Sequence, residues 1–501
     1  MIRSSGVLMP VFSLPGPFAW GVLGEESLNF ARSLKKAGIS RWQVLPLSPP
    51  GAFASPYQCI SSFAGNPAFI DPRGLYKDGL ISDEELRSLY VDEVSPRIHY
   101  GEALPRHTQI LKQAFTRFAT RDFEELTRFR QKEASWLENY AVFMTARELF
   151  GEKPWWEWPD PLLQKKDEEA VRNFAREHAA SIHYYIFEQY EFFKQLTELR
   201  RQINELGIAV IGDLPIYPAA DSTDLWGRRE LFETDENGYP SRVAGVPPDY
   251  FSAEGQLWGN PLYRWDKMKE DKYRYWIERI GKAMEWYDLL RLDHFRGFES
   301  YWAVPAGETT AINGVWEKGP AMDLFEDLLR LYPQGAFIAE DLGEITADVR
   351  QFLQATGIPG MKVLQFAFDP FFESKDRPHS YKANMVAFTG THDNDTLLGW
   401  ARAAGDEEWQ LICRYFGLKA DSRDIDGPLS PLCRRVILTL WQSVANLVIV
   451  PITDLLGLDS SYRINHPGTI GGNWEMRLTQ EQLDSLDLEW LAGINEVCQR
   501  N

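Results

Sequence analysis

The chain has 501 residues, 44% of them hydrophobic, and carries a formal net charge of −19. This length could form two or three ordinary domains, or one large barrel with insertions. The hydrophobic content is sufficient for an extensive core. The negative charge disfavours nucleic acids and anionic membrane surfaces as partners, because both would repel the protein. It is compatible with a neutral substrate.

Neither the cysteines nor the first residues indicate secretion. The four cysteines lie far apart and form no CxxC motif, whereas disulfide frameworks are typical of small secreted domains. The start of the chain has no signal-peptide-like apolar core. No apolar run approaches the ~20 residues of a membrane-spanning helix. We therefore expect free thiols and a cytoplasmic protein.

Eight short apolar or β-branched runs recur along the chain, and helical patterns separate many of them. The runs are residues 7–13, 41–47, 208–217, 289–295, 336–343, 362–368, 384–390 and 447–454. Helical patterns at 26–37, 182–206 and 273–286 precede the second, third and fourth runs. Alternating strands and helices predict a parallel sheet with right-handed crossovers. Eight such strands predict an α/β fold, the closed (β/α)8 TIM barrel.

Two long segments interrupt this alternation. The segment between the second and third strands is far longer than a βα connection requires, and it predicts a mainly helical insertion at 48–180. Its helical patterns cover residues 104–118, 122–150 and 167–177. The segment 219–265 is rich in Gly, Pro, Tyr and Trp and has little periodicity. We expect a loop-rich insertion over the active site at 218–270, within a single catalytic barrel that spans 1–501.

Three predicted strands end in carboxylates. Asp293 follows an apolar run between Arg291 and His294, and two later strand ends carry Glu340 and Asp393. Buried charges are costly unless they are paired, so a strand core alone does not explain this pattern. In a (β/α)8 barrel the carboxyl ends of the strands surround one mouth, where the active site lies. We therefore expect the three carboxylates to share one site.

This set of carboxylates suits the cleavage of a glycosidic bond, which requires one ionised carboxylate and one protonated carboxylic acid. Asp293, beside arginines, is the predicted nucleophile. Glu340 follows an apolar run that should raise its pKa, which suits a general acid. Asp393 could bind substrate hydroxyls and stabilise the transition state. The alternatives are a structural ion-pair network and a metal site that includes His294 and His392, although the sequence has no HExxH motif.

The segments around these carboxylates resemble the conserved segments of the amylomaltases, the 4-α-glucanotransferases of glycoside hydrolase family 77 in the α-amylase clan. They read RLDHFRG at 291–297, AEDLG at 339–343 and TGTHDNDT at 389–396. The resemblance covers nearly the whole chain, and so many motifs in the right order make it very specific. Further matching segments are 55–58, 63–67, 154–159, 245–251, 255–263, 301–308, 360–368, 467–469 and 473–474.

The resemblance implies a (β/α)8 barrel with helical insertions, a retaining mechanism, and neither a cofactor nor an essential metal. It assigns Asp293 as the nucleophile, Glu340 as the acid/base and Asp393 as the transition-state stabiliser in the transfer of α-1,4-glucan segments. The substrate-binding residues that it implies are Tyr57, Arg291, His294, Asp369 and His392 around the donor sugar, Asp249, Gln256 and Trp258 on a flexible loop over the groove, and Asn465 and Pro467 on a second covering loop.

The expected partners are maltooligosaccharides and α-1,4-glucans, with no nucleic acid and no membrane, and we expect a monomer or a weak homo-oligomer. One rival interpretation is an α-glucan hydrolase of the same clan, which passes the glucosyl group to water. The other is a non-catalytic maltodextrin-binding protein, which the presence of all three carboxylates disfavours. Departures from the usual family pattern at 9–12, Pro218 and Thr453 leave chain-length preference open. The 18 tryptophans fit either a core or platforms for a ligand.

Overall fold

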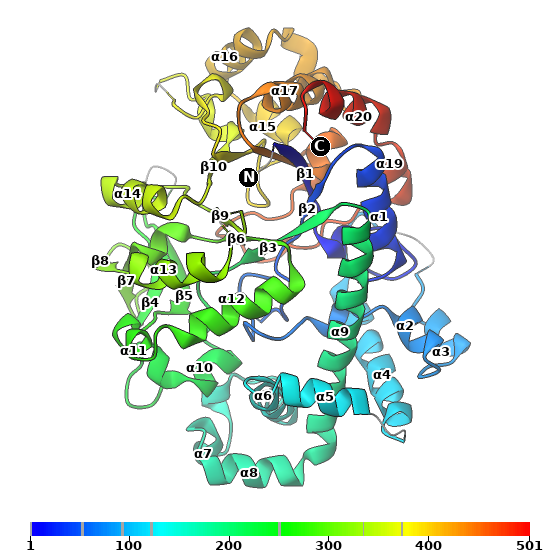
Figure 1. Cartoon of the computed structure of the whole chain (residues 1–501), viewed down its shortest axis with the longest axis vertical. Helices are drawn as coiled ribbons and strands as arrows, with labels where there is room; N and C mark the ends of the chain where they lie inside the picture. The colour runs from blue at the N-terminus through cyan, green and yellow to red at the C-terminus, as the bar shows by residue number, and fades with distance from the viewer. Residues whose placement is uncertain are drawn as a thin grey trace.

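The computed structural model describes residues 3–51, 55–91, 95–120, 124–248, 252–333, 335–371 and 374–500. Eight parallel strands close into a barrel in the order β1-β12-β11-β10-β9-β6-β3-β2 (Figure 1). Their bounds are β1 Ser4–Leu8, β2 Arg41–Gln43, β3 Ala209–Leu214, β6 Leu289–Leu292, β9 Phe337–Ala339, β10 Gly360–Val363, β11 Met385–Phe388 and β12 Leu447–Pro451. The predicted (β/α)8 TIM barrel is confirmed.

Each predicted strand overlaps one of these strands, but the paired segments are shorter. The first run, 7–13, ends in the 3-10 turn η1 (Val11–Ser13), and the run 362–368 ends in the 3-10 turn η7 (Leu364–Ala367). In both turns most side chains remain buried. The apolar pattern therefore continues beyond the point where the strand leaves its neighbours, and Pro10, which has no N–H to donate to a ladder, precedes η1.

The strands lie in the core and the helices cover them. Strands β1, β6, β11 and β12 are buried along their whole length, as parallel strands with helices on their outer face usually are. β1 pairs with both β12 and β2, so the first strand closes the barrel against the last. The helices that follow or flank the barrel strands are α1 Glu25–Lys36, α12 Arg274–Trp286, α13 Met322–Leu331, α14 Ala347–Thr356, α15 Leu397–Ala403, α16 Asp406–Phe416, α17 Pro431–Gln442, α18 Ile452–Leu455, α19 Gln480–Asp484 and α20 Leu488–Val497.

The segment of the chain between β2 and β3 forms a group of helices, which occupies the lower part of Figure 1, away from α15–α17. These helices are α2 Pro72–Lys77, α3 Asp83–Arg87, α4 Tyr100–Phe118, α5 Glu124–Lys132, α6 Leu137–Leu149, α7 Pro161–Gln164, α8 Glu168–Glu177 and the long α9 Ala179–Glu205. The single helical pattern at 122–150 is in fact two helices. The helix is interrupted at Glu133, which is buried. Glu133 accepts a hydrogen bond from Trp136 Nε1 and forms an ion pair with Lys282, both at 2.7 Å.

A four-stranded antiparallel sheet, in the order β5-β4-β7-β8, lies beside the barrel (Figure 1). Its strands are β4 Arg242–Val246, β5 Gln256–Pro261, β7 Ser300–Pro305 and β8 Val315–Lys318, and the short helices α10 Thr223–Gly227 and α11 Trp265–Glu270 flank the first two. The segment expected to be loop-rich therefore contains two strands. Their Gly and Pro residues interrupt the alternation of apolar and polar residues that is typical of a strand. One partner of β4 is β7, which follows β6 in the chain.

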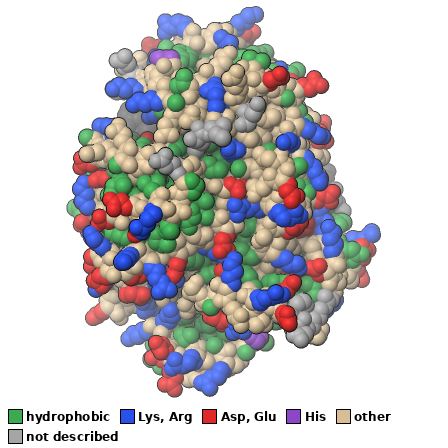
Figure 2. Space-filling model, viewed as in Figure 1, with side chains coloured by type: hydrophobic (Ala, Val, Ile, Leu, Met, Phe, Trp, Pro, Cys, Tyr) green, Lys and Arg blue, Asp and Glu red, His purple; other side chains and the backbone are tan. Residues whose placement is uncertain are grey.

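The surface is mixed in charge. Acidic and basic side chains are interspersed over the face drawn in Figure 2, which is how a chain with a large net charge avoids local repulsion. In the part of the chain that the structure describes, no helix is both long enough and apolar enough to cross a bilayer.

Candidate active site

Four strand ends bring carboxylates to the mouth of the barrel; β3, β6 and β9 are neighbours, and β10 separates β9 from β11. Asp213 lies near the end of β3, Asp293 follows β6, Glu340 follows β9, and Asp393 lies on the segment after β11. The Glu340 N–H donates to the Leu292 carbonyl at 3.1 Å, which continues the pairing of β6 and β9 past their last ladder residues. The predicted convergence of the three carboxylates at one end of the barrel agrees with this geometry.

Arg291 is the positive charge at the centre of the site. It is only 4% exposed, and its Nη1 lies 2.7 Å from Asp213 Oδ1 and 2.8 Å from Asp293 Oδ1. A buried cation needs such partners, because removing it from water is costly. Burial raises the pKa of Asp293 above its ordinary value, and the Arg291 guanidinium opposes that shift. Arg291 therefore keeps Asp293 oriented and stabilises its ionised form.

Arg296, the second arginine that we expected beside Asp293, contacts other residues. Arg296 donates a hydrogen bond to the Glu344 carbonyl and places its guanidinium 3.9 Å from the centre of the Trp316 ring. The backbone at His294 has a left-handed φ of 48°, which turns the chain sharply after Asp293. Among the described residues, one arginine, Arg291, forms an ion pair with the predicted nucleophile.

Glu340 is held by backbone donors. Its Oε2 accepts the N–H of His294 at 2.8 Å and its Oε1 accepts the N–H of Leu342 at 2.7 Å. Burial raises the pKa of Glu340 to about 7; Arg291 and the two N–H groups oppose this shift, while the Asp293 charge adds to it. A carboxyl group with a pKa near neutrality is matched to proton transfer at neutral pH.

Asp393 has the opposite character. Although burial alone would raise its pKa, His392 and the Asn465 amide lower it to about 2. The Asp393 carboxylate lies 3.3 Å from His392 Nε2 and accepts a hydrogen bond from Asn465 Nδ2 at 2.6 Å. Arg463 donates to the Asp393 backbone carbonyl at 2.6 Å. Asp393 is thus ionised at neutral pH.

Tyr57 links the two sides of the mouth. Its hydroxyl donates to Asp213 Oδ2 at 2.9 Å and lies 3.3 Å from His392 Nδ1. Its ring stacks on the His392 ring, with centroids 4.8 Å apart and planes at 15°. The ring is half-buried, so it supplies a flat apolar surface beside the carboxylates.

The antiparallel sheet brings two further predicted residues to the site. Trp258 of β5 meets the His294 ring edge to face, with centroids 4.8 Å apart. Its Nε1 donates to Gln256 Oε1 at 3.2 Å, and Gln58 Nε2 donates to the Trp258 carbonyl at 3.4 Å. These contacts attach β5 to the rim of the barrel, so the sheet is part of the site.

Two of the predicted residues that the structure describes do not join this network. Asp369 accepts the Phe371 N–H at 2.8 Å within its own turn, and Pro467 is exposed two residues beyond Asn465. Among the described residues, neither forms a hydrogen bond or ion pair with the three carboxylates. Asp249 lies outside the described residues.

Similarity to known proteins extends over the whole chain. The sequence model of glycoside hydrolase family 77, described as 4-alpha-glucanotransferase, matches residues 9–483. The chain belongs to glycoside hydrolase family 77. It is 43% identical over 510 residues to a 4-alpha-glucanotransferase from Thermus thermophilus, with 99% of each chain covered. It is 40% identical to the one from Aquifex aeolicus, with 98% of this chain and 99% of that one covered.

A solved structure agrees with this membership. The chain superposes on the amylomaltase from Streptococcus agalactiae in complex with acarbose with a TM-score of 0.94, at 36% identity and over the full length of both chains. The 4-α-glucanotransferase activity of family 77 is therefore the activity of this chain.

Sequence reasoning missed two residues of this family 77 site. Asp213 interrupts the apolar run of β3 at its carboxyl end, which is the same signal that identified Asp293, so it could have been found. Arg463 could not, because it lies on an irregular segment and reaches Asp393 only through the fold.

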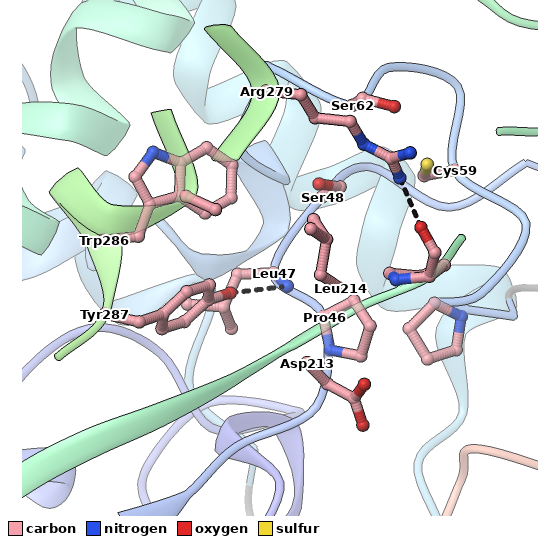
Figure 3. Close-up of a pocket in the computed structure, with 13 residues that line it drawn as sticks. Pro46, Leu47, Ser48, Cys59, Ser62, Asp213, Leu214, Arg279, Trp286 and Tyr287 are labelled. Atoms are coloured by element: carbon pink, nitrogen blue, oxygen red, sulfur yellow. Dashed lines mark hydrogen bonds between the residues drawn. The ribbon is translucent and has the colours of Figure 1, made fainter. Parts of the chain in front are cut away.

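A small cavity lies between the carboxyl ends of β2 and β3 and helix α12, lined by residues that include Asp213, Arg279 and Trp286 (Figure 3). Its volume is about 20 Å³, which is room for a water molecule but not for a sugar. Figure 3 shows the Asp213 carboxylate pointing away from Arg279 and Trp286.

Protein groups offset part of the negative charge of the site. Arg291, His392 and backbone N–H donors face the carboxylates. The described residues contain no group of three or more His, Cys, Asp or Glu side chains placed to hold a metal ion.

Proposed function

We propose that this family 77 enzyme moves α-1,4-glucan segments from maltooligosaccharide or starch-type donors to the 4-hydroxyl of acceptor glucans, by a retaining double displacement. The observation that carries the proposal is the pairing of two unlike carboxyl groups on adjacent strand ends. Asp293 contacts a buried arginine, whereas Glu340 has a pKa near neutrality. The Streptococcus agalactiae amylomaltase structure with acarbose supports an α-glucan as the ligand.

In the first step, a carboxylate oxygen of Asp293 attacks the anomeric carbon of the donor. The bond from that carbon to the glycosidic oxygen breaks, and Glu340 gives its proton to the departing oxygen. The products of this step are a glucosyl ester on Asp293, an ionised Glu340 and a shortened glucan with a new 4-hydroxyl.

In the second step, Glu340 accepts the proton of the acceptor 4-hydroxyl as that oxygen attacks the anomeric carbon. The ester bond to Asp293 breaks, and both carboxyl groups return to their starting states. Two inversions at one carbon retain the α configuration.

Asp393 acts in both steps through its charge. Positive charge develops on the sugar ring in the transition state, and an anion that is already in place stabilises it without reorganisation. The pair with His392 and the Asn465 amide keep Asp393 ionised and fixed. Tyr57 and Trp258 present aromatic surface, on which the C–H face of a pyranose can stack.

Trapping the covalent intermediate tests these roles. In Glu340→Gln, transfer from maltooligosaccharides should fall by about 10²- to 10⁴-fold, because the leaving oxygen is no longer protonated. An α-glucosyl fluoride needs little protonation to react, so the variant should accumulate a glucosyl adduct. Peptide mass spectrometry should locate the adduct on Asp293, and the double variant Asp293→Asn/Glu340→Gln should form none. A label on Asp213 or Asp393 would contradict the assignment.

We also propose a cytoplasmic location and a monomer or weak homo-oligomer. All four cysteines are free thiols in the structure, which is typical of a reducing compartment. The net charge of −19 supports a neutral glucan over nucleic acid as the partner.

A further inference from the structure

Asp454 is a buried carboxyl group on α18, the helix directly after the last barrel strand. It is 1% exposed. Its Oδ2 accepts a hydrogen bond from Thr389 Oγ1 at 2.6 Å, and its Oδ1 accepts one from the Leu397 N–H at 2.7 Å. Each carboxyl oxygen is therefore bound to a different point of the chain.

The two donors are the ends of one segment. Thr389 follows β11 directly, and Leu397 is the first residue of α15. The residues from 389 to 397, here called the catalytic segment, carry His392 and Asp393 between these ends. The Asp454 carboxyl group thus connects the two ends of the segment that carries the His392–Asp393 ion pair.

We propose that Asp454 is a positioning residue, which holds both ends of the catalytic segment together and thereby sets the placement of His392 and Asp393. The proposal rests on the function proposed above for Asp393. A displacement of about 1 Å in a catalytic group can cost on the order of 10²-fold in rate, so a group that fixes the base of such a segment controls turnover from a distance.

Other contacts shape the segment but do not join its ends. Asn394 accepts hydrogen bonds from the Thr391 N–H and Oγ1, both at 2.9 Å, which forms the turn that presents Asp393. Asn465 and Arg463 hold Asp393 from outside. With Asp454 removed, this local turn can persist while it shifts as a unit relative to Arg291 and Glu340.

The choice of variants follows from the donors. In Asp454→Ala both contacts are lost. In Asp454→Asn the amide oxygen can accept the Leu397 N–H, and the amide nitrogen can donate to the Thr389 hydroxyl, because a hydroxyl both donates and accepts. Asparagine should therefore preserve the hydrogen bonds to Thr389 and Leu397, whereas alanine should not.

A matched control is available at the opposite end of the barrel. Asn495 is 1% exposed, accepts hydrogen bonds from Ser5 at 2.5 Å and Trp441 at 3.0 Å, and donates to the Ala37 carbonyl at 2.9 Å. Asn495→Ala removes buried hydrogen bonds far from the catalytic segment. It should lower the melting temperature without changing kcat at temperatures where the variant is folded.

The experiment compares kcat, KM and melting temperature for the wild type and these variants with maltotriose. Asp454→Ala should lose on the order of 10²-fold in kcat, with a much smaller change in KM, and Asp454→Asn should retain most of the wild-type kcat. A folded Asp454→Ala with wild-type kcat, or a loss equal to that of Asn495→Ala, would overturn the proposal.

Two additional variants make every outcome informative. If Asp454→Ala does not fold, Thr389→Val removes one of the two contacts at nearly constant volume. It should lower kcat and leave KM nearly unchanged. A wild-type kcat in this variant would refute the positioning role of Asp454. Asp393→Asn is measured alongside. Activity in Asp393→Asn would refute the role of Asp393 itself, whereas an inactive Asp393→Asn beside a fully active Asp454→Ala would refute only the positioning role.

Discussion

Single residues decide which carboxyl group carries a proton in this site. Glu340 and Asp393 lie at the same mouth, yet the pKa of the first is raised to about 7 by burial and that of the second is lowered to about 2, because its partners His392 and Asn465 outweigh burial. Environments that shift the pKa values of two carboxyl groups in opposite directions make one a proton donor and the other an anion.

The raised pKa of Glu340 predicts the pH dependence of the first chemical step. The general acid must be protonated, and its proton is lost as the pH rises through about 7. For maltooligosaccharide donors, kcat/KM should therefore fall about tenfold for each pH unit above that pH. Initial rates at low donor concentration between pH 5 and 9, with the enzyme shown to be folded throughout, measure this limb.

An α-glucosyl fluoride provides the control for that profile, because fluoride departs with little help from an acid. Its glucosylation rate should lack the basic limb that Glu340 causes. If both donors show the same limb, another group is responsible for it.

At the scale of elements, the two insertions have different consequences. The antiparallel sheet attaches Trp258 to the barrel rim through His294 and Gln58, so it contributes directly to the site. The helices between β2 and β3 add buried structure, and the last of them, α9, carries a buried acid, Glu188, which accepts a hydrogen bond from Tyr184.

Glu188 makes the stability of the protein sensitive to pH. Burial raises its pKa to about 8 in the folded protein, whereas an unfolded chain would ionise it at about 4.3. Between these values the folded state binds one more proton than the unfolded state. The free energy of unfolding should therefore fall as the pH rises through this window, by up to about 1.4 kcal/mol per pH unit.

Glu188→Gln keeps the neutral form and should weaken this dependence. The melting temperature of the wild type should fall more steeply than that of the variant between pH 5.5 and 8. Glu198→Gln on the same helix is the matched control: the pKa of Glu198 is lowered to about 2 by Arg201 and Gln202, so this group is ionised throughout the window. Parallel profiles for the wild type and Glu188→Gln would refute the assignment.

At the scale of the whole molecule, the barrel and its covering segments must favour a sugar acceptor over water. Water is in large excess, so the acceptor must win through positioning, and effective molarities of oriented groups reach ~10⁵ M or more. β5 and the segment that carries Asn465 both contact the mouth, and such covering elements can exclude water during the lifetime of the intermediate.

Maltotriose should therefore yield glucose together with a series of longer maltooligosaccharides. Each transfer conserves the number of glycosidic bonds, whereas each hydrolysis creates one reducing end. A reducing-end assay run beside chromatography measures the ratio. If reducing ends increase in step with the donor consumed, the enzyme acts as a hydrolase and the transfer proposal fails.

The sequence permitted a prediction of the barrel because each strand is short, apolar and separated from the next by a local pattern. It also located Asp293 and Glu340, because a charge directly after a buried run is costly without a function. It did not reveal β4 and β5, because β4 pairs with β7, a strand beyond β6, and β5 joins the sheet only through β4. Nor did it reveal the break between α5 and α6, where Glu133 turns inward to Lys282.

Local hydrogen-bonding patterns and the burial of apolar runs thus determined the order of the elements, the eight-stranded barrel and the strand ends that carry the carboxylates. Only the tertiary structure decided which charges meet. Arg291 pairs with Asp213 as well as Asp293, Arg296 turns away to Trp316, and Asp454 closes the catalytic segment. Arg291 meets Asp213, and Asp454 meets Thr389, because closing the barrel places strands that are remote in sequence side by side.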